Sequence, residues 1–204
     1  AAVGVLLADA LQQHLLVGLV GRGRNKALEG LRGAVVEGVG LGHGQAGQQQ
    51  AARAALHAGA GRVYVGLLEA HPRTATSAVR WDPASPELMF RSVNALLDSP
   101  LLASAAVVCG CGGGASVTTV LPHILSRAHT LVLDADALNA VASDTTLQAL
   151  LSERSDRGWS SVLTPHPLEA ARLLCCGTAD VMADRLSAAS LLAQRWEVIC
   201  VLKG

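Results

Sequence analysis

Residues 105–139, AAVVCGCGGGASVTTVLPHILSRAHTLVLDADALN, contain two short apolar runs on either side of a stretch with helical spacing. The first run, 105–109, ends on glycines, and the second, 130–133, ends on the polar segment DADALN (134–139). Apolar runs separated by a helix predict buried parallel strands joined by a crossover. Ligands of such sheets bind beyond the carboxyl ends of the strands, so we expect this glycine-rich and acidic edge to be functional.

Two later runs repeat the pattern, because residues 161–163 lead into TPHPLE and residues 198–202 lead into Lys203 and Gly204. Strand and helix in turn predict a three-layer α/β/α domain with a largely parallel sheet and one shared cleft. A further strand is expected at 62–68. The helices are expected at residues 48–58, 86–97, 116–126, 138–151, from 167 onward, and 179–194.

The first 47 residues differ from the rest because glycines crowd them and their periodicity is weak. Residues 15–20 and 34–39 are apolar enough for strands, although the glycines would weaken them. We therefore divide the chain into a poorly specified segment, 1–47, and a domain, 48–204. The last strand has no helix after it, so we expect this domain to be truncated at its C-terminus.

Composition excludes several functional classes. Sixteen basic residues balance sixteen acidic ones and aromatic residues are 2% of the chain, which argues against a nucleic-acid surface. The five cysteines lack zinc-ligand spacing, so reduced thiols in a cytoplasmic protein are expected. The apolar start of the chain is interrupted by polar residues and has no basic region, so we predict neither a signal peptide nor a membrane segment.

Glycines 110 and 112–114 place free backbone N–H groups between a strand and a helix, where an anion could sit against Gly112 or Gly114; a tight turn is the alternative. If the extended backbone continues, Asp134 and Asp136 point to one side and could share a proton or bind Mg²⁺. Either carboxylate could instead cap the following helix.

Two prolines hold His166 in a fixed place, where it could donate to a ligand or cap the next helix. Glu169 lies in the first turn of that helix, where its charge favours the dipole. Asn139 could orient a neighbouring loop or form a hydrogen bond within its own helix. Lys203 could bind a phosphate group or be solvated. Motifs of phosphate-binding loops, serine hydrolases and zinc peptidases do not occur, and we predict no residue of the chain as a metal ligand.

Together GCGGG, VLDADALN, LTPHPLEAARLL and VLKG, in this order, resemble the ADP/ATP-dependent NAD(P)H-hydrate dehydratase family over residues 48–204. This resemblance implies a ribokinase-like fold and the dehydration of the S epimer of NAD(P)HX to NAD(P)H at the expense of ADP or ATP with Mg²⁺. It implies a small-molecule substrate, no nucleic acid or membrane partner, a cytoplasmic location and a homo-oligomer.

The resemblance further implies that the hydrated cofactor contacts a set of polar and glycine residues, and that the nucleotide phosphates contact the last two residues of the chain. The first set is Gly112, Gly114, Asp136, Asn139, His166, Glu169 and Arg172; the second is Lys203 and Gly204. The family's catalytic Asp, in a later GTGD loop, is expected beyond Gly204, so we expect this chain to bind without turnover.

Two departures from the family pattern stand out. The family's glycine-rich segment near the amino end cannot be aligned with residues 1–47, and Leu168 replaces a common glycine. A ribokinase-like vitamin or sugar kinase and a non-catalytic nucleotide-binding fragment are the alternatives.

Overall fold

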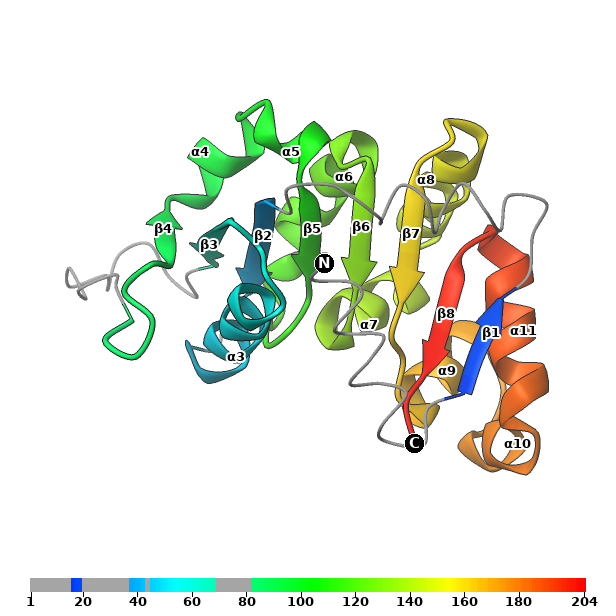
Figure 1. Ribbon diagram of the computed structural model, residues 1–204. Helices are drawn as coiled ribbons and strands as arrows, with labels where there is room; N and C mark the ends of the chain where they lie inside the picture. The colour runs from blue at the N-terminus through cyan, green and yellow to red at the C-terminus, as the bar shows by residue number, and fades with distance from the viewer. Residues whose placement is uncertain (1–15, 20–36, 43–44, 69–81) are drawn as a thin grey trace.

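The computed structural model describes residues 16–19, 37–42, 45–68 and 82–204, and these form one mixed sheet with helices on both faces (Figure 1). The strand order is β1-β8-β7-β6-β5-β2-β3-β4, with every pair parallel except β1 and β8. The strands are β1 Leu16–Leu19, β2 Glu37–Gly42, β3 Arg62–Leu67, β4 Met89–Arg91, β5 Ala106–Cys109, β6 Thr130–Leu133, β7 Ser160–Leu163 and β8 Ile199–Leu202. The expected largely parallel α/β fold is confirmed.

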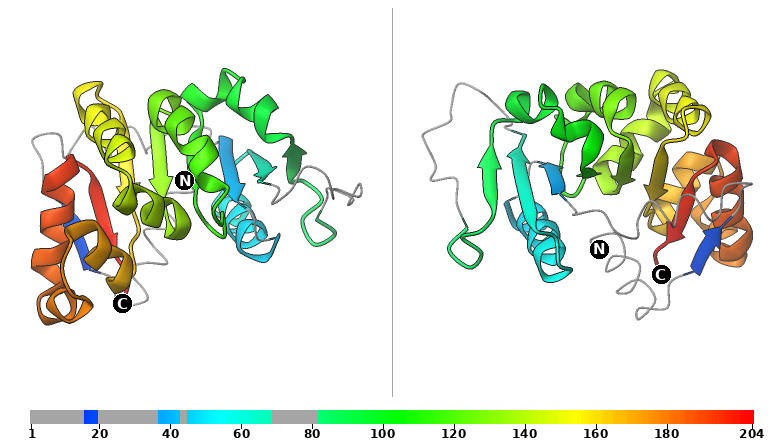
Figure 2. Two further views of the ribbon diagram at one scale, coloured as in Figure 1. Left: turned by 180° about the vertical axis from the view of Figure 1, so that it is seen from behind. Right: turned by 45° about the horizontal axis from the view of Figure 1, so that its top comes forward.

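The described helices divide unequally between the two faces of the sheet. Helix α3 packs against β2 and β3 on one face, while α6 to α9 and α11 form a continuous layer on the other (Figure 2). The helices are α3 Gln45–His57, α4 Val93–Leu97, α5 Leu101–Ser104, α6 Val117–Arg127, α7 Ala135–Ser143, α8 Thr145–Asp156, α9 Pro167–Leu174, α10 Thr178–Ala183 and α11 Arg185–Trp196. None of the helices in the described part of the chain is long and apolar enough to span a membrane.

The alternation of side chains along the strands builds two hydrophobic clusters. Val107 and Cys109 of β5 point into the larger cluster, beneath the helical layer, whereas Ala106 packs against the smaller cluster below α3. Because successive side chains of a strand leave opposite faces, one apolar run serves both clusters. The central strands are accordingly apolar on both faces, as the sequence predicted.

Three expected helices differ from the structure. Residues 86–97 were expected to be helical throughout, but Met89–Arg91 form the edge strand β4 and only Val93–Leu97 are helical. The helices expected at 138–151 and 179–194 are each divided in two, at Asp144 and Asp184. Each aspartate caps the second helix of its pair: Asp144 Oδ1 accepts from Thr146 and Leu147, and Asp184 Oδ1 accepts from Ser187.

The amino-terminal segment contributes strands to the same sheet. Strand β1 lies within the apolar stretch 15–20. Strand β2 overlaps the second stretch, 34–39, but begins three residues after its start, at Glu37, and pairs with both β3 and β5. The remaining residues of 1–47 lie outside the described ranges, apart from the start of α3. The proposed division at residue 47 stays a prediction.

An ion pair joins α3 to the segment that precedes β4. Arg53 donates from Nε and Nη2 to the two carboxylate oxygens of Asp82, at 2.6 Å each, and Ala84 N donates to Asp82 Oδ1 at 3.0 Å. The Asp82 side chain is 1% exposed and that of Arg53 is 37% exposed. The hydrogen bonds from Arg53 hold the pKa of the Asp82 carboxyl below its ordinary value, although burial opposes them.

We expect this pair to stabilise the chain only where Asp82 is ionised. A depressed folded-state pKa means that the contribution is complete above the unfolded pKa of about 3.9 and is lost as the pH falls through the folded value. The difference in free energy of unfolding between the chain and Asp82→Asn should therefore be constant near neutrality and shrink below about pH 4. Urea unfolding at a series of pH values measures it, and a difference that grows in acid would contradict this role.

Candidate functional site

The carboxyl ends of β5, β6, β7 and β8 lie at one edge of the sheet, which we call the strand-end edge (Figure 1). Backbone hydrogen bonds continue beyond the strands: Asp134 N donates to Cys109 O, Thr164 N to Leu133 O and Lys203 N to Pro165 O, at 2.8–3.1 Å. These bonds fix the residues that follow each strand relative to the next strand. The expected gathering of four distant motifs at one edge is confirmed.

The glycine turn after β5 is held by close backbone packing. Gly110 has φ +110°, and a Cβ atom placed there would lie 2.0 Å from the carbonyl oxygen of Asp134. The Gly110 carbonyl oxygen accepts from Gly113 N and Asp136 N, which ties the turn to the start of α7. Gly110 is therefore required by the fold, whereas Gly112 and Gly114, which are also at positive φ, are exposed at the edge.

Asp134 joins three of the strand ends through its side chain. Its Oδ1 accepts from the Lys203 ammonium at 2.5 Å, and its Oδ2 lies 3.6 Å from the Cys111 sulfur. We call Cys111, Asp134 and Lys203 the strand-end triad. The triad places the cation of Lys203 at the edge where a phosphate ligand of an α/β sheet would lie.

Asp136 makes a separate interaction, because helix α7 begins at Ala135 and the extended backbone stops there. Its Oδ2 accepts from Gly114 N at 2.8 Å, so the carboxylate occupies one of the backbone donors that were expected to face an anion. The expected alignment of Asp134 and Asp136 on one side depended on continued extended geometry, and the two carboxylates bind different partners. Asp136 shapes the glycine turn rather than capping α7.

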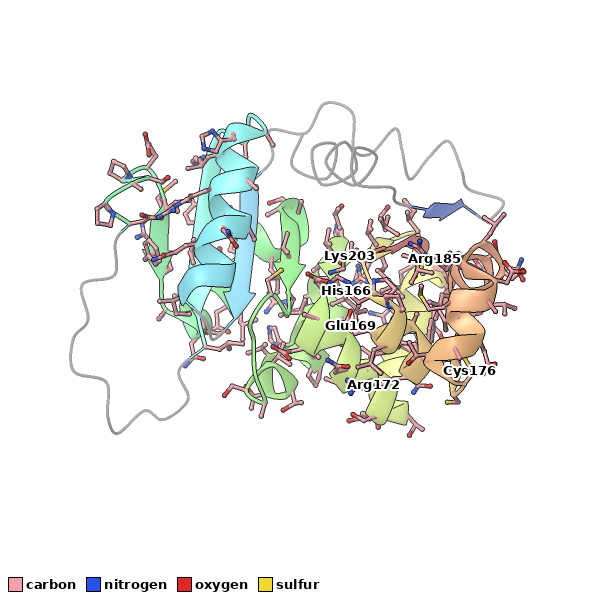
Figure 3. The ribbon with its side chains drawn as sticks, turned by 90° about the horizontal axis from the view of Figure 1, so that it is seen from below. His166, Glu169, Arg172, Cys176, Arg185 and Lys203 are labelled. Carbon is pink, nitrogen blue, oxygen red and sulfur yellow. The ribbon has the colours of Figure 1, made fainter. Side chains whose placement is uncertain are left out.

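His166 lies directly before α9 and is exposed. Its backbone N donates to Glu169 Oε2 at 2.8 Å, so Glu169 serves the first turn of the helix as its position suggested. The imidazole of His166 is exposed at the strand-end edge, where a ligand can reach it. Figure 3 shows His166 and Lys203 close together at the strand-end edge, with Glu169 and Arg172 following along α9.

Arg172 lies farther along α9, where it contacts the neighbouring helix. Its Nη1 donates to Asn139 Oδ1 at 2.6 Å, which links α9 to α7 across their packed faces. Asn139 therefore bonds to a neighbouring element rather than within its own helix. Both residues are at least partly exposed, so the pair could contact a ligand that extends outward from His166.

The cysteines near the edge differ in environment, and all five in the chain are free thiols. Burial, with smaller contributions from the Asp134 carboxylate, raises the pKa of Cys111 to about 12, and burial alone raises that of Cys200 to about 12. Burial also raises the pKa of Cys109. These thiols are protonated at neutral pH, so Cys111 acts as a hydrogen-bond donor to Asp134.

The described residues contain no group of three or more His, Cys, Asp or Glu side chains able to hold a metal ion.

The chain matches the family model described as NAD(P)H-hydrate dehydratase over residues 45–204. The chain belongs to the NAD(P)H-hydrate dehydratase family. The match covers every strand from β3 to β8 and all the residues of the strand-end edge. The resemblance stated from the four motifs is confirmed, and the kinase alternative is not favoured.

Two curated relatives show how much of this family's length the chain represents. It is 36% identical over 158 residues to the ADP-dependent (S)-NAD(P)H-hydrate dehydratase of Neisseria meningitidis, covering 76% of this chain and 50% of that protein. It is 35% identical over 173 residues to the bifunctional NAD(P)H-hydrate repair enzyme Nnr of Escherichia coli, covering 81% of this chain and 30% of that protein. The chain thus spans half or less of the length of these relatives.

A solved structure supports the fold. The ADP/ATP-dependent NAD(P)H-hydrate dehydratase of Bacillus subtilis, co-crystallised with ATP and Mg²⁺ and soaked with CoA, superimposes with a TM-score of 0.59 at 22% identity. The superposition covers 85% of this chain and 61% of that one. The likeness to this structure supports the α/β fold of the chain.

Cys111 is the residue of the strand-end triad that the sequence did not single out for chemistry. It stands inside the glycine run, and nothing in the residue pattern indicates that its sulfur meets a carboxylate from the next strand. The roles predicted for the remaining site residues stay predictions.

Proposed function

We propose that the protein containing this chain dehydrates the S epimer of NAD(P)HX to NAD(P)H with ADP or ATP as co-substrate. The observation that carries the proposal is the family match over residues 45–204, within which the four motifs meet at the strand-end edge. The Neisseria meningitidis relative is an ADP-dependent dehydratase, which supports ADP as the nucleotide. The Bacillus subtilis structure, obtained with ATP and Mg²⁺, supports a requirement for a nucleotide and a divalent cation.

The proposed chemistry converts a poor leaving group into a good one. The hydroxyl group of the hydrate loses its proton to a general base, and its oxygen attacks the terminal phosphoryl group of the nucleotide, whose P–O bond to the leaving nucleotide breaks. Phosphate then leaves as the C–O bond breaks, and a proton is lost from the adjacent ring position, which restores the double bond. Electrostatic stabilisation and positioning supply most of the catalysis in phosphoryl transfer.

Within this proposal the chain supplies binding groups at the strand-end edge. Lys203 contacts a phosphate through the N–H donors that Asp134 does not use, and Gly204 follows it along the same phosphate chain. The exposed glycines, Gly112 and Gly114, lie against the hydrated cofactor, and the His166 imidazole donates to it. Mg²⁺, where bound, supplies charge neutralisation at the phosphates.

The other residues proposed to contact the hydrated cofactor mainly hold neighbouring groups in place. Asp136 fixes the glycine turn through Gly114 N, Glu169 fixes the backbone of His166, and the pair of Asn139 and Arg172 borders the outer side of α7 and α9. A cytoplasmic, homo-oligomeric enzyme of metabolite repair is the wider setting that we propose.

We expect Lys203→Met to weaken binding of ADP by about 10- to 100-fold, because a charge-assisted hydrogen bond contributes about 1.5–3 kcal/mol. Isothermal titration calorimetry of the chain with ADP measures this loss. Arg157→Met is the matched control, since Arg157 is an exposed cation just before β7, at the opposite edge of the sheet. Unchanged ADP affinity in Lys203→Met, or an equal loss in both variants, would remove Lys203 from the nucleotide site.

The same calorimetry with the S and R epimers of NADHX tests the other half of the proposal. Preferential binding of the S epimer is expected, and His166→Ala should reduce it without altering the affinity for ADP. Equal binding of both epimers, or binding of neither, would contradict the proposed substrate.

A further inference from the structure

Lys203 does not present a free cation at the strand-end edge. Its ammonium lies 2.5 Å from Asp134 Oδ1, and the two side chains are 24% and 22% exposed. We propose that Asp134 sets the charge of the phosphate-binding end: it neutralises Lys203 in the ligand-free chain and so limits how strongly the site attracts highly charged phosphates. This inference rests on the role of Lys203 in the proposed function.

Asp134 is held in this place by contacts that do not involve Lys203. Its backbone N donates to Cys109 O at 3.0 Å, and the next residue, Ala135, has φ 44° and starts helix α7. The Cys111 thiol lies 3.6 Å from Oδ2, the oxygen that Lys203 does not contact. The carboxylate is therefore fixed by two neighbouring strand ends, and Lys203 reaches it from the end of β8.

The Asp134 carboxylate determines the net charge around this pair. Asp136 is bonded to Gly114 N, and the guanidinium of Arg185, at the start of α11, lies beside the carbonyl of Leu202 with Nη2 at 3.4 Å. With Asp134 ionised, the carboxylate cancels the Lys203 charge, and the guanidinium of Arg185 is a further cation at the end of β8. Removing the carboxylate adds one unit of positive charge where a phosphate would bind, and the effect falls with salt because the groups are partly exposed.

The first test compares nucleotide affinities of the chain and Asp134→Asn in the presence of a chelator, so that no divalent cation masks the ligand charge. We expect Asp134→Asn to bind ADP about tenfold more tightly at low salt, with a smaller gain for AMP and for both ligands at high salt. Asp156→Asn is the matched control, because Asp156 is an exposed aspartate at the end of α8, near the opposite edge of the sheet. That control should leave both affinities unchanged.

A double variant shows whether Asp134 acts through Lys203. In the Lys203→Met background, we expect Asp134→Asn to lose most of its effect on ADP affinity, since the cation that it exposes is absent. If Asp134→Asn weakens ADP binding as Lys203→Met does, the carboxylate holds the lysine in place instead of neutralising it, and the proposal is overturned. A gain that persists without Lys203 would overturn it as well.

The second test needs no ligand and follows the Cys111 thiol. Asp134 raises the pKa of Cys111 and Lys203 lowers it, with the neighbouring Cys109 also buried nearby. In Asp134→Asn the thiol faces an unneutralised ammonium, so its alkylation at a fixed alkaline pH should be about tenfold faster. The rate is measured by mass spectrometry of the Cys111 peptide in a background that carries Cys175→Ser and Cys176→Ser, which removes the two exposed thiols.

The two tests separate this inference from the proposed function. If the chain does not bind ADP but Asp134→Asn gains affinity for inorganic pyrophosphate and speeds Cys111 alkylation, the proposed nucleotide is wrong and the charge-setting role stands. If ADP binds through Lys203 but Asp134→Asn changes neither the affinity nor the alkylation rate, the role of Asp134 fails and the proposed function stands. Asp134→Glu is the control for a general loss of stability, because it changes the side chain but keeps the negative charge. It should therefore restore the slow alkylation, whereas a fall in thermal stability common to all Asp134 variants would affect it as well.

Discussion

Replacement of Gly110 by alanine is expected to abolish stable folding of the chain. A Cβ atom at this position would lie 2.0 Å from Asp134 O, 2.6 Å from Ala137 Cβ and 2.8 Å from Ala137 N, distances that no side-chain rotation can relieve. The backbone at φ +110° is also disfavoured for any residue with a Cβ atom. We expect a loss of more than about 4 kcal/mol, which is a large part of the roughly 5–15 kcal/mol that stabilises an ordinary domain.

Gly158→Ala separates the clash from the backbone conformation. Gly158 has φ +71°, but a Cβ atom there meets nothing within 4 Å. This variant should therefore lose only about 1 kcal/mol, the usual cost of a non-glycine residue in a left-handed conformation. Urea unfolding followed by circular dichroism measures both, and similar losses in the two variants would show that packing against α7 is not what requires glycine at 110.

The contact that makes Gly110 necessary is also part of the strand-end edge. The main chain of Asp134 passes against Gly110, and the side chain of Asp134 binds Lys203. Any variant that moved the two backbones apart would displace the carboxylate from the lysine. Backbone packing therefore requires glycine at position 110, whether or not a ligand contacts it.

The sheet could be predicted from the sequence because its strands are buried on both faces. Runs such as residues 131–133 and 198–202 are apolar without interruption, and each is followed by polar or glycine residues. The alternation with helices indicated parallel crossovers, which place those followers at one edge. The position of β2 was less well predicted, because the sequence of Glu37–Gly42 alternates glycine with other residues and has little strand propensity.

Three helix boundaries could not be predicted because tertiary contacts decide them. Leu88 and Met89 fit a helical spacing with Val93, but residues 89–91 pair with β3 and extend the sheet. The breaks at Asp144 and Asp184 look like ordinary polar positions within long helical patterns. Each becomes a cap because its carboxylate finds backbone donors of a second helix that leaves in a new direction.

The sequence predicted where the candidate residues lie better than which groups they form hydrogen bonds with. Its expected members do lie at or near the strand-end edge, yet Asp136 bonds to Gly114 and Arg172 to Asn139. The partners in these two hydrogen bonds are 22 and 33 residues apart in the sequence, and residue spacing alone does not predict such contacts. Asp134 and Asp136 look alike in the sequence, and only the start of α7 between them sends one to Lys203 and the other to the glycine turn.

Arg154 is a further residue whose role the sequence did not reveal, because its position on α8 resembles that of any charged surface residue. The side chain is 1% exposed, and its Nη1 donates to the carbonyls of Leu125 and Ala128, at 2.9 and 2.6 Å. Those carbonyls belong to the end of α6, where a helix has acceptors without internal partners and a negative dipole end. Nε and Nη2 donate to Ser161 Oγ and Ser160 O, which joins α6, α8 and β7.

We expect Arg154→Met to destabilise the chain by about 3 kcal/mol. Burial lowers the pKa of the guanidinium to about 10, so the group remains charged at neutral pH and its removal relieves a desolvation cost. That relief is smaller than the cost of leaving several buried acceptors without donors, at about 1–3 kcal/mol each before relaxation. Arg154→Ala should lose about 1–2 kcal/mol more, because it also opens a cavity beneath Trp159.

Arg157→Met is the control for the Arg154 variants, since Arg157 also contacts Trp159 but is exposed and pairs with the exposed Glu153. It should change the free energy of unfolding by less than about 0.5 kcal/mol. Urea unfolding of the three variants distinguishes the contributions: the step from Arg157→Met to Arg154→Met reports the hydrogen bonds, and the step to Arg154→Ala reports the cavity. If Arg154→Met were as stable as the parent chain, the carbonyls at the end of α6 would have to find other donors, and the buried arginine would be replaceable by any side chain of similar volume.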